Sequence, residues 1–155
     1  MANASPKVYW ESSPFVATLW NETGRAHICQ AVLQSARNGE IELYTSMLTL
    51  VEVFKVPDSP QEEVAEQVLT DFFRNRWIRK VEVDWFVAQE ARSLQRRFPR
   101  LDGRDATHLA TAVYLEVGTM HTYDRDDLLR LNGQIPHLVI QEPAPFGTLP
   151  MDLRP

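Results

Sequence analysis

Residues 101–129 constrain the fold of this chain most, because they place two acidic clusters at the two ends of one helix–strand unit. Asp102 and Asp105 stand at the start of a periodic segment, and the second cluster follows a short apolar run: Asp124, Asp126 and Asp127. Apolar residues recur between them at helical spacing, which predicts one buried helix face that ends at Gly118: Ala106, Leu109, Ala110, Val113 and Val117. In an open α/β sheet, ligands bind at the edge where such carboxylates lie.

The length and composition of the chain indicate one soluble globular domain. It has 155 residues, of which 44% are hydrophobic and 24% charged. We predict a folded domain over residues 1–142 and a proline-rich C-terminal tail over residues 143–155. The single cysteine, Cys29, cannot form a disulfide within the chain. The N-terminus has no signal-peptide pattern, and no apolar run is long enough for a membrane span, so we expect a cytoplasmic protein.

Charge is distributed unevenly along the chain. Residues 74–104 contain nine basic residues and four acids, so their net charge is +5. Because the whole chain has a net charge of −5, the rest of the chain has a net charge of −10. We call residues 74–104 the basic sector. The net charge argues against a general nucleic-acid coat protein. A basic sector beside an acidic pocket suits a metal-dependent nuclease, but taken alone the sector is better explained as a solvated helix face carrying arginines.

Strand and helix patterns alternate along the whole chain, which predicts the α/β class with a largely parallel sheet. The predicted strands are Lys7–Trp10, Ile41–Thr45, Trp77–Val83, Thr119–Tyr123 and Pro136–Ile140. The predicted helices cover a short segment from Ser12 or Ser13, a segment that ends near Asn38–Gly39, residues 47–56 up to Pro57, Pro60–Phe73, Trp85–Phe98 and residues 105–117. The second of these helices should bury one face: Ile28, Ala31, Val32 and Ser35.

Four acids should meet at the carboxyl edge of the sheet. Glu11 follows the first predicted strand and Asp124 the fourth, Asp105 opens a helix, and Glu52 lies on the helix after the second strand. Carboxylates gathered in one pocket repel each other and need a compensating cation. Oxygen ligands without cysteine or clustered histidine favour Mg²⁺ or Mn²⁺ over Zn²⁺. Such an ion can activate a bound water and stabilise charge on a phosphodiester.

Four segments of the chain, taken in order, resemble the four motifs of PIN-domain ribonucleases, most closely the VapC-type toxins of toxin–antitoxin pairs. They are ESS after the first strand, then TSMLTLVEV, RDATHLATA and HTYDRDDL. The resemblance covers nearly the whole chain. It implies a three-layer α/β/α sandwich with a mainly parallel five-stranded sheet, an acidic Mg²⁺ site, and hydrolysis of RNA by a metal-activated water. It also implies a homodimer and a small antitoxin whose tail reaches the acidic pocket.

The resemblance assigns roles to particular residues. The four catalytic acids become Glu11, Glu52, Asp105 and Asp124, with Asp127, or less readily Asp126, as an auxiliary acid. The implied ligands of Mg²⁺ or Mn²⁺ are Glu11, Asp105 and Asp124. Within the basic sector, the candidate RNA contacts are Arg96, Arg97, Arg100 and Arg104.

One position departs from the family pattern, because the first acid is usually aspartate and here it is Glu11. The extra methylene shifts the carboxylate by roughly 1.5 Å, whereas Mg²⁺ requires near-ideal octahedral distances. Either the site is weakened, which would leave an RNA- or protein-binding module, or the pocket is adapted to glutamate. The family's residue types at the other three acids favour a gain in metal affinity on Glu11→Asp. We expect His108 and Cys29 to be packed residues rather than catalysts.

Overall fold

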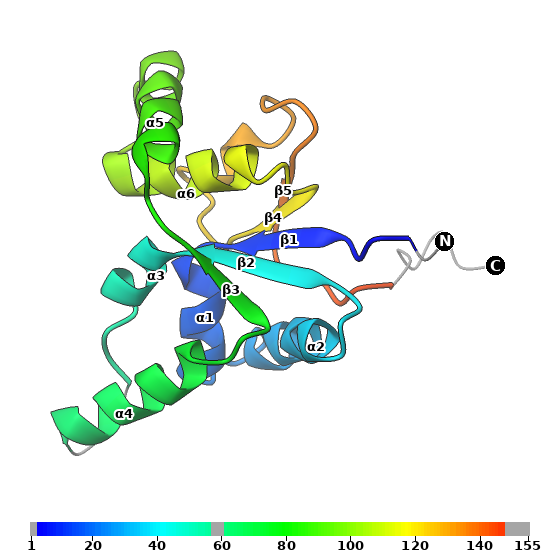
Figure 1. Cartoon of the computed structure of the whole chain (residues 1–155), viewed down its shortest axis with the longest axis vertical. Coiled ribbons are helices and arrows are strands. Elements are labelled where there is room, and N and C mark those ends of the chain that lie inside the picture. The colour runs from blue at the N-terminus through cyan, green and yellow to red at the C-terminus, as the bar shows by residue number, and fades with distance from the viewer. Residues whose placement is uncertain (1–2, 57–60, 148–155) are drawn as a thin grey trace.

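A computed structural model describes residues 3–56 and 61–147 of the chain. Its five strands form one parallel sheet in the order β3-β2-β1-β4-β5 (Figure 1). The strands are β1 (Lys7–Trp10), β2 (Glu42–Ser46), β3 (Ile78–Val81), β4 (Thr119–His121) and β5 (Val139–Gln141). The predicted α/β class and five-stranded parallel sheet are therefore confirmed. Since β1 is central and pairs with β2 and β4, the carboxyl ends of these three strands lie side by side.

Helices cover both faces of the sheet, which gives the predicted three layers (Figure 1). The helices are α1 (Ser12–Leu19), α2 (Ala26–Arg37), α3 (Met47–Glu52), α4 (Glu62–Phe73), α5 (Trp85–Arg97), α6 (Gly103–Tyr114) and the 3₁₀ helix η1 (Leu129–Leu131). Helices α1 and α2 lie on one face, and α5 and α6 on the other. Among the described residues, no helix has the length and apolar character that crossing a membrane requires.

The core has two parts, one on each face of the sheet. Consecutive side chains of a strand point to opposite faces, so Tyr9 packs under α5 and α6 with Leu109 and Met120. Its neighbour Trp10 packs on the other face against Phe15 of α1. Both β1 side chains are fully buried, which fits a central strand of a doubly covered parallel sheet.

Polar caps start the helices that point at the carboxyl edge of the sheet. Glu11 follows β1 directly and accepts a hydrogen bond from the backbone N–H of Ser13, and Ser46 at the end of β2 caps α3. Asp102 caps α6 by accepting from the backbone N–H of Asp105 at 2.8 Å. Each cap satisfies a free N–H of the first helical turn. The strand ends and helix starts therefore bring polar side chains to one edge of the molecule.

Three helix predictions need correction. Helix α6 ends at Tyr114 rather than at Gly118, and the positive φ that follows its end is at Glu116, with 54°. The buried face of α2 is turned by about one residue from the predicted one, and Ala31 is exposed. The buried residues are Ala26, Cys29, Val32, Leu33 and Ala36. Helix α3 ends at Glu52 rather than at residue 56, because Val53 leaves the helical conformation and its side chain is buried in the core. Pro57, expected to stop this helix, and the predicted start of the next helix at residues 58–60 lie outside the described residues.

Strand boundaries also differ from the predicted ones. Strands β3 and β4 are shorter than the apolar runs that predicted them, and β5 begins at Val139 rather than Pro136. Backbone pairing with the neighbouring strand limits the length of β3, which pairs only with residues 43–46 of β2. Of the predicted tail, residues 143–147 contain a turn but no helix or strand, and residues 148–155 lie outside the described part of the chain.

Candidate active site

A cleft of about 710 Å³ opens at the carboxyl edge of the sheet, between α1, α3, α6 and the loop that follows β4. Six carboxylates line it: Glu11, Glu52, Asp102, Asp105, Asp124 and Asp127. The structure thus brings together all five acids that the sequence proposed for catalysis. Asp102, expected in the same cluster, joins them as the cap of α6. Asp126 is exposed and does not line the cleft.

Three of these acids form a close group, in which carboxylate oxygens of Asp105, Asp124 and Asp127 lie within 4.8 Å of one another. The backbone N–H of Asp127 donates to Asp124 at 3.0 Å, which fixes the loop that carries both residues. Burial, and then the neighbouring carboxylates, raise the pKa of Asp105 from 3.8 to about 7. An all-oxygen group that shares too much negative charge is suited to a hard divalent cation.

Glu11 lies beside this group but is not a member of it. It is buried, and one carboxylate oxygen accepts hydrogen bonds from both the backbone N–H and the hydroxyl of Ser13. The same Ser13 oxygen accepts from the backbone N–H of Tyr123 at 2.9 Å. Burial raises the pKa of Glu11, against the effect of the Ser13 hydrogen bonds. The sequence analysis expected Glu11, Asp105 and Asp124 as metal ligands, whereas the close group in the structure contains Asp127 in place of Glu11.

Glu52 occupies the opposite wall and is held through its Oε1 atom. This oxygen accepts from the Ser12 hydroxyl at 2.7 Å and is hydrogen-bonded to Nε2 of His108. His108 is buried, and its Nδ1 atom lies 2.7 Å from the hydroxyl of Tyr9. Desolvation alone would raise the pKa of Glu52, but the His108 and Ser12 hydrogen bonds outweigh it and lower the pKa. The expected role of His108 as a packed, hydrogen-bonded residue agrees with this geometry.

Only one of the four candidate RNA-binding arginines lines the cleft. Arg104 does so from the first turn of α6, where it lies 3.7 Å from Asp102. The other three are exposed around the end of α5 and do not line the cleft: Arg96, Arg97 and Arg100. Arg97 donates to the backbone carbonyl of Gln134 at 2.7 Å.

Among the lining residues to which the sequence reasoning gave no role in the site, Arg25 and Tyr123 are in contact with each other. Arg25 is the residue before α2, and its guanidinium carbon lies 4.2 Å from the centroid of the Tyr123 ring. Helical periodicity could not have found Arg25, because its neighbour lies nearly a hundred positions away in the sequence. The position of Tyr123, directly before Asp124, was the one available signal for its location at the cleft.

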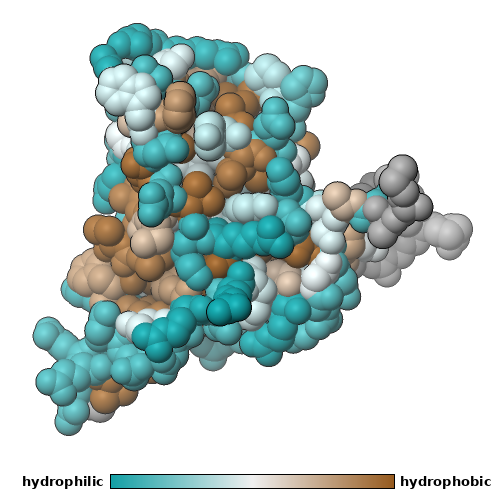
Figure 2. Space-filling model, in the orientation of Figure 1, coloured by the Kyte–Doolittle hydropathy of each residue, from teal (hydrophilic) through white to brown (hydrophobic). Residues whose placement is uncertain are grey.

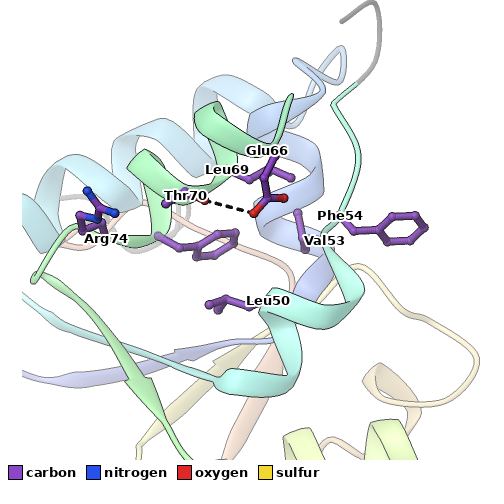
Figure 3. A pocket seen from close by; sticks show the side chains of 8 residues that line it. Leu50, Val53, Phe54, Glu66, Leu69, Thr70 and Arg74 are labelled. Carbon is purple, nitrogen blue, oxygen red and sulfur yellow. Dashed lines mark hydrogen bonds between the residues drawn. The ribbon is translucent and has the colours of Figure 1, made fainter. Parts of the chain in front are cut away.

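An apolar groove adjoins the acidic cleft between α3 and α4. It has two parts of about 300 and 670 Å³, and Figure 3 shows Leu50, Val53 and Leu69 in the first of them. Phe54 lines both parts and also the acidic cleft. Figure 2 shows apolar side chains gathered on the surface over α3, where Val51 and Phe54 are 72% and 62% exposed. The apolar groove and the acidic cleft therefore adjoin at Phe54.

The PIN domain family profile matches residues 8–133, which span β1 to the loop after η1 and include every acid of the cleft. The chain belongs to the PIN domain family. No curated protein matched it. The resemblance drawn from the four motifs is thereby confirmed at the level of the family, and the fold is the PIN-like α/β sandwich.

Solved structures with this fold include toxins of toxin–antitoxin pairs. VapC20 from Mycobacterium tuberculosis superposes with a TM-score of 0.62 at 16% identity, over 77% of this chain and 91% of that one. VapBC2 from Rickettsia felis gives 0.65 at 13% identity, over 88% and 98%. A toxin–antitoxin complex from Klebsiella pneumoniae gives 0.59 at 17% identity, over 85% and 95%. At these identities the likeness shows a shared fold.

Proposed function

We propose that this PIN domain is a Mg²⁺- or Mn²⁺-dependent endoribonuclease that acts as the toxin of a VapBC-type pair. The observation that carries the proposal is the close group of Asp105, Asp124 and Asp127 in a cleft that also holds Glu11 and Glu52. The similar structures support the same class: VapC20 is described as a toxin that cleaves the sarcin–ricin loop, and the other two as toxin–antitoxin assemblies. Cellular RNA as the substrate implies a cytoplasmic location.

The donor set of the cleft fits a hard divalent cation. All the donors are carboxylate oxygens. Burial, and then the neighbouring carboxylates, raise the pKa of Asp105, and a bound cation would relieve the repulsion between these carboxylates. We assign Asp105, Asp124 and Asp127 as the residues that would hold the ion, with Glu11 as an additional ligand on the adjoining wall. When bound, such an ion lowers the pKa of a coordinated water and stabilises charge on a phosphodiester.

Glu52 is placed to handle a proton in this reaction. Its Oε1 atom accepts both hydrogen bonds, from Ser12 and His108, and Oε2 has no partner among residues 3–56 and 61–147. The lowered pKa keeps the carboxylate ionised at neutral pH. We assign Oε2 as the atom that orients, or accepts a proton from, the attacking water. A positioned general base of this kind contributes typically 10²–10⁴-fold to a rate.

The basic sector provides a path for the RNA backbone outside the cleft. Arg104 lies at its rim, and Arg96, Arg97 and Arg100 continue from the end of the adjoining helix. Each phosphate contact releases counterions, so affinity for RNA should fall with salt. Replacing the last three arginines with alanine should flatten this dependence. An unchanged dependence of RNA affinity on salt would show that these arginines only form a solvated helix face.

We assign the apolar groove between α3 and α4 to the antitoxin. Phe54 lines both the groove and the acidic cleft, so a peptide in the groove has a direct route to the carboxylates. Such a peptide would cover the exposed Phe54 and block access of RNA. We also propose that the chain forms a homodimer, as the family resemblance implies.

A second candidate function is an RNA- or protein-binding module with an impaired metal site. The observation that favours it is Glu11, which replaces the usual aspartate and stands outside the close group. Such a module would keep RNA or protein binding but would not cleave.

A cleavage assay separates the two functions. The purified chain is incubated with mixed cellular RNAs in Mg²⁺, in Mn²⁺ and with chelator, and the products are resolved by gel electrophoresis. We expect discrete fragments that require metal and disappear in Asp105→Asn. Binding of RNA without fragments in any metal would support the binding module instead.

A further inference from the structure

We infer that Arg25 and Tyr123 form a nucleotide subsite that holds a single-stranded segment of RNA next to the three-acid group; this inference rests on the proposed nuclease function. Arg25 supplies a cation for a phosphate, and its flat guanidinium on the Tyr123 ring supplies a surface for an unpaired base. Neither residue belongs to the four acidic positions of the site, and Arg25 lies outside the four motifs.

Arg25 is held at the cleft by contacts on two sides. Its guanidinium carbon lies 4.2 Å from the centroid of the Tyr123 ring, and its Nη1 atom is 3.3 Å from a carboxylate oxygen of Glu22. Within the described ranges, Glu22 is the one carboxylate that pairs with this guanidinium. The side chain still has 44% of its surface exposed. Donor N–H groups therefore remain available to a phosphate, which a guanidinium can bind through two parallel hydrogen bonds.

Tyr123 is fixed relative to the acidic group. Its backbone N–H donates to Ser13, whose hydroxyl also bonds to Glu11, and its phenol oxygen lies 3.5 Å from the sulfur of Cys29. Asp124 follows directly in the chain. Because both the backbone and the phenol group of Tyr123 are held, its ring has a fixed position relative to Asp124. A nucleotide stacked at this ring would therefore lie at a fixed distance from the acids. This makes Tyr123 a rigid platform rather than a free surface side chain.

Charge explains why the cleft needs this arginine. Among the described residues, six carboxylates line it but only two guanidinium groups, those of Arg25 and Arg104. Arg104 lies 3.7 Å from Asp102, which neutralises part of its charge. The two arginines also come from opposite faces of the sheet, one before α2 and one in α6 (Figure 1). A polyanionic strand that crosses the carboxyl edge would meet one cation on each side of the acids.

The subsite favours single-stranded RNA, because a base inside a duplex would first have to be unpaired and unstacked to reach a protein platform, and this costs free energy. Stacking on an aromatic or guanidinium plane tolerates any base, since every base has a π face. The subsite therefore positions a strand without selecting its sequence.

The test measures binding of a fluorescein-labelled ten-nucleotide uridine RNA by fluorescence anisotropy, in the full chain carrying Asp105→Asn and without metal, so that the probe is not cut. We expect Arg25→Gln to weaken binding about tenfold and to reduce the log–log salt slope by about 0.7, the value for one single-strand phosphate contact. Tyr123→Leu should weaken binding about tenfold by loss of the platform. Tyr123→Phe should retain most of the affinity.

Arg37→Gln is the matched control. Arg37 ends the same helix, lies 5.3 Å over the ring of Trp77, and is outside the acidic cleft. Equal losses in Arg25→Gln and Arg37→Gln would overturn the subsite, because they would reflect net charge alone. Equally tight binding of the same RNA as a duplex would overturn the role of base stacking. If an acidic peptide binds at Arg25 more tightly than the RNA does, the nucleotide subsite is wrong and Arg25 contacts a protein instead.

The nuclease proposal fails separately. If the chain without substitutions cuts no RNA in any metal while Arg25→Gln still weakens RNA binding, the subsite stands and the nuclease proposal falls. If that chain cuts RNA and Arg25→Gln leaves both the Kd and the KM unchanged, the subsite alone is wrong.

Discussion

His108 of α6 and Glu52 of α3 are joined by a side-chain hydrogen bond, although 56 residues separate them in the chain. The ionised carboxylate can only accept, so Nε2 of His108 carries the proton. Burial raises the pKa of Tyr9 and keeps its hydroxyl protonated, which allows it to donate to Nδ1. Both nitrogens of the His108 ring thus have a hydrogen-bond partner. The bond ties the proposed proton acceptor of the cleft to the central strand.

Tyr9→Phe tests this buried network. The substitution keeps the ring and removes one donor, which leaves Nδ1 of His108 buried and unsatisfied. We expect a loss of about 1–3 kcal/mol in the free energy of unfolding, measured by urea denaturation. Tyr44→Phe is the control, since its hydroxyl bonds to Glu42 on a partly exposed surface and should cost less than about 0.5 kcal/mol. Equal losses for the two variants would contradict the network.

Asp105→Asn should stabilise the metal-free protein at alkaline pH. The pKa of Asp105 is raised from 3.8 to about 7, so between these values the folded chain binds the proton that the unfolded chain has released. Stability therefore falls as pH rises through this window, and at pH 8 the ionised carboxylate destabilises the fold. After a discount for partial exposure we expect the variant to gain roughly 1–2 kcal/mol at pH 8 and almost nothing at pH 4.

Thermal unfolding at pH 4, 6 and 8 measures this difference. Mg²⁺ should reverse the order of the two proteins at pH 8, because a ligand that binds only the folded state stabilises it by mass action. A gap between the variants that is the same at all three pH values would contradict the raised pKa of Asp105.

Much of the fold follows from patterns within the sequence. The apolar stripe that begins at Ala106 identifies α6, although the helix ends at Tyr114 and not at Gly118. The acids before the helix and after the next strand mark the carboxyl edge, because parallel strands bring their ends together. The polar residues after the first two strands predicted where helices begin: Ser46 caps α3 as expected, and α1 begins at Ser12, although its cap is Glu11 rather than Ser12 or Ser13. These are local features of the chain, and the structure agrees with them apart from these two differences.

Features that depend on tertiary contacts were not predictable in the same way. The face of α2 was wrong by about one residue, since a helix with Ile28, Cys29, Val32 and Leu33 offers two apolar faces, and only the sheet selects one. The membership of Asp127 in the close group depends on the turn after Asp124. Arg25 reaches the cleft only because the α1–α2 connection lies beside the loop after β4.

Helix α4 provides a prediction about self-association. Val64 and Val68 of this helix are 47% and 44% exposed. We expect light scattering at micromolar concentration to give twice the monomer mass. Val64→Lys combined with Val68→Lys should give a monomer that keeps its secondary structure by circular dichroism, because both side chains are exposed on the single chain.

Gln67→Lys, on the same helix and also exposed, is the control for added charge and should remain dimeric. A monomer for the chain without substitutions at micromolar concentration would show that this surface does not join two copies.

The substitution Glu11→Asp tests whether the longer side chain of glutamate weakens metal binding or whether the pocket is adapted to it. Residue types alone favoured a gain in metal affinity on shortening, but the structure changes this expectation. The Glu11 carboxylate is tied to the backbone and hydroxyl of Ser13, and Ser13 in turn holds the backbone of Tyr123. Aspartate can keep the cap on α1, but its carboxylate would be withdrawn from the cleft by roughly 1.5 Å.

We therefore expect Glu11→Asp to weaken Mn²⁺ binding about tenfold, which corresponds to roughly 1.4 kcal/mol, with a parallel fall in cleavage. Isothermal titration calorimetry with Mn²⁺ and the RNA assay measure the two effects. Glu11→Gln keeps the length, removes the charge and should weaken binding at least as much. Tighter binding in Glu11→Asp would identify glutamate as a misfit, because the shorter acid would then approach the ion more closely. Unchanged binding and cleavage in Glu11→Gln would remove Glu11 from the metal site, which would then consist of Asp105, Asp124 and Asp127 alone.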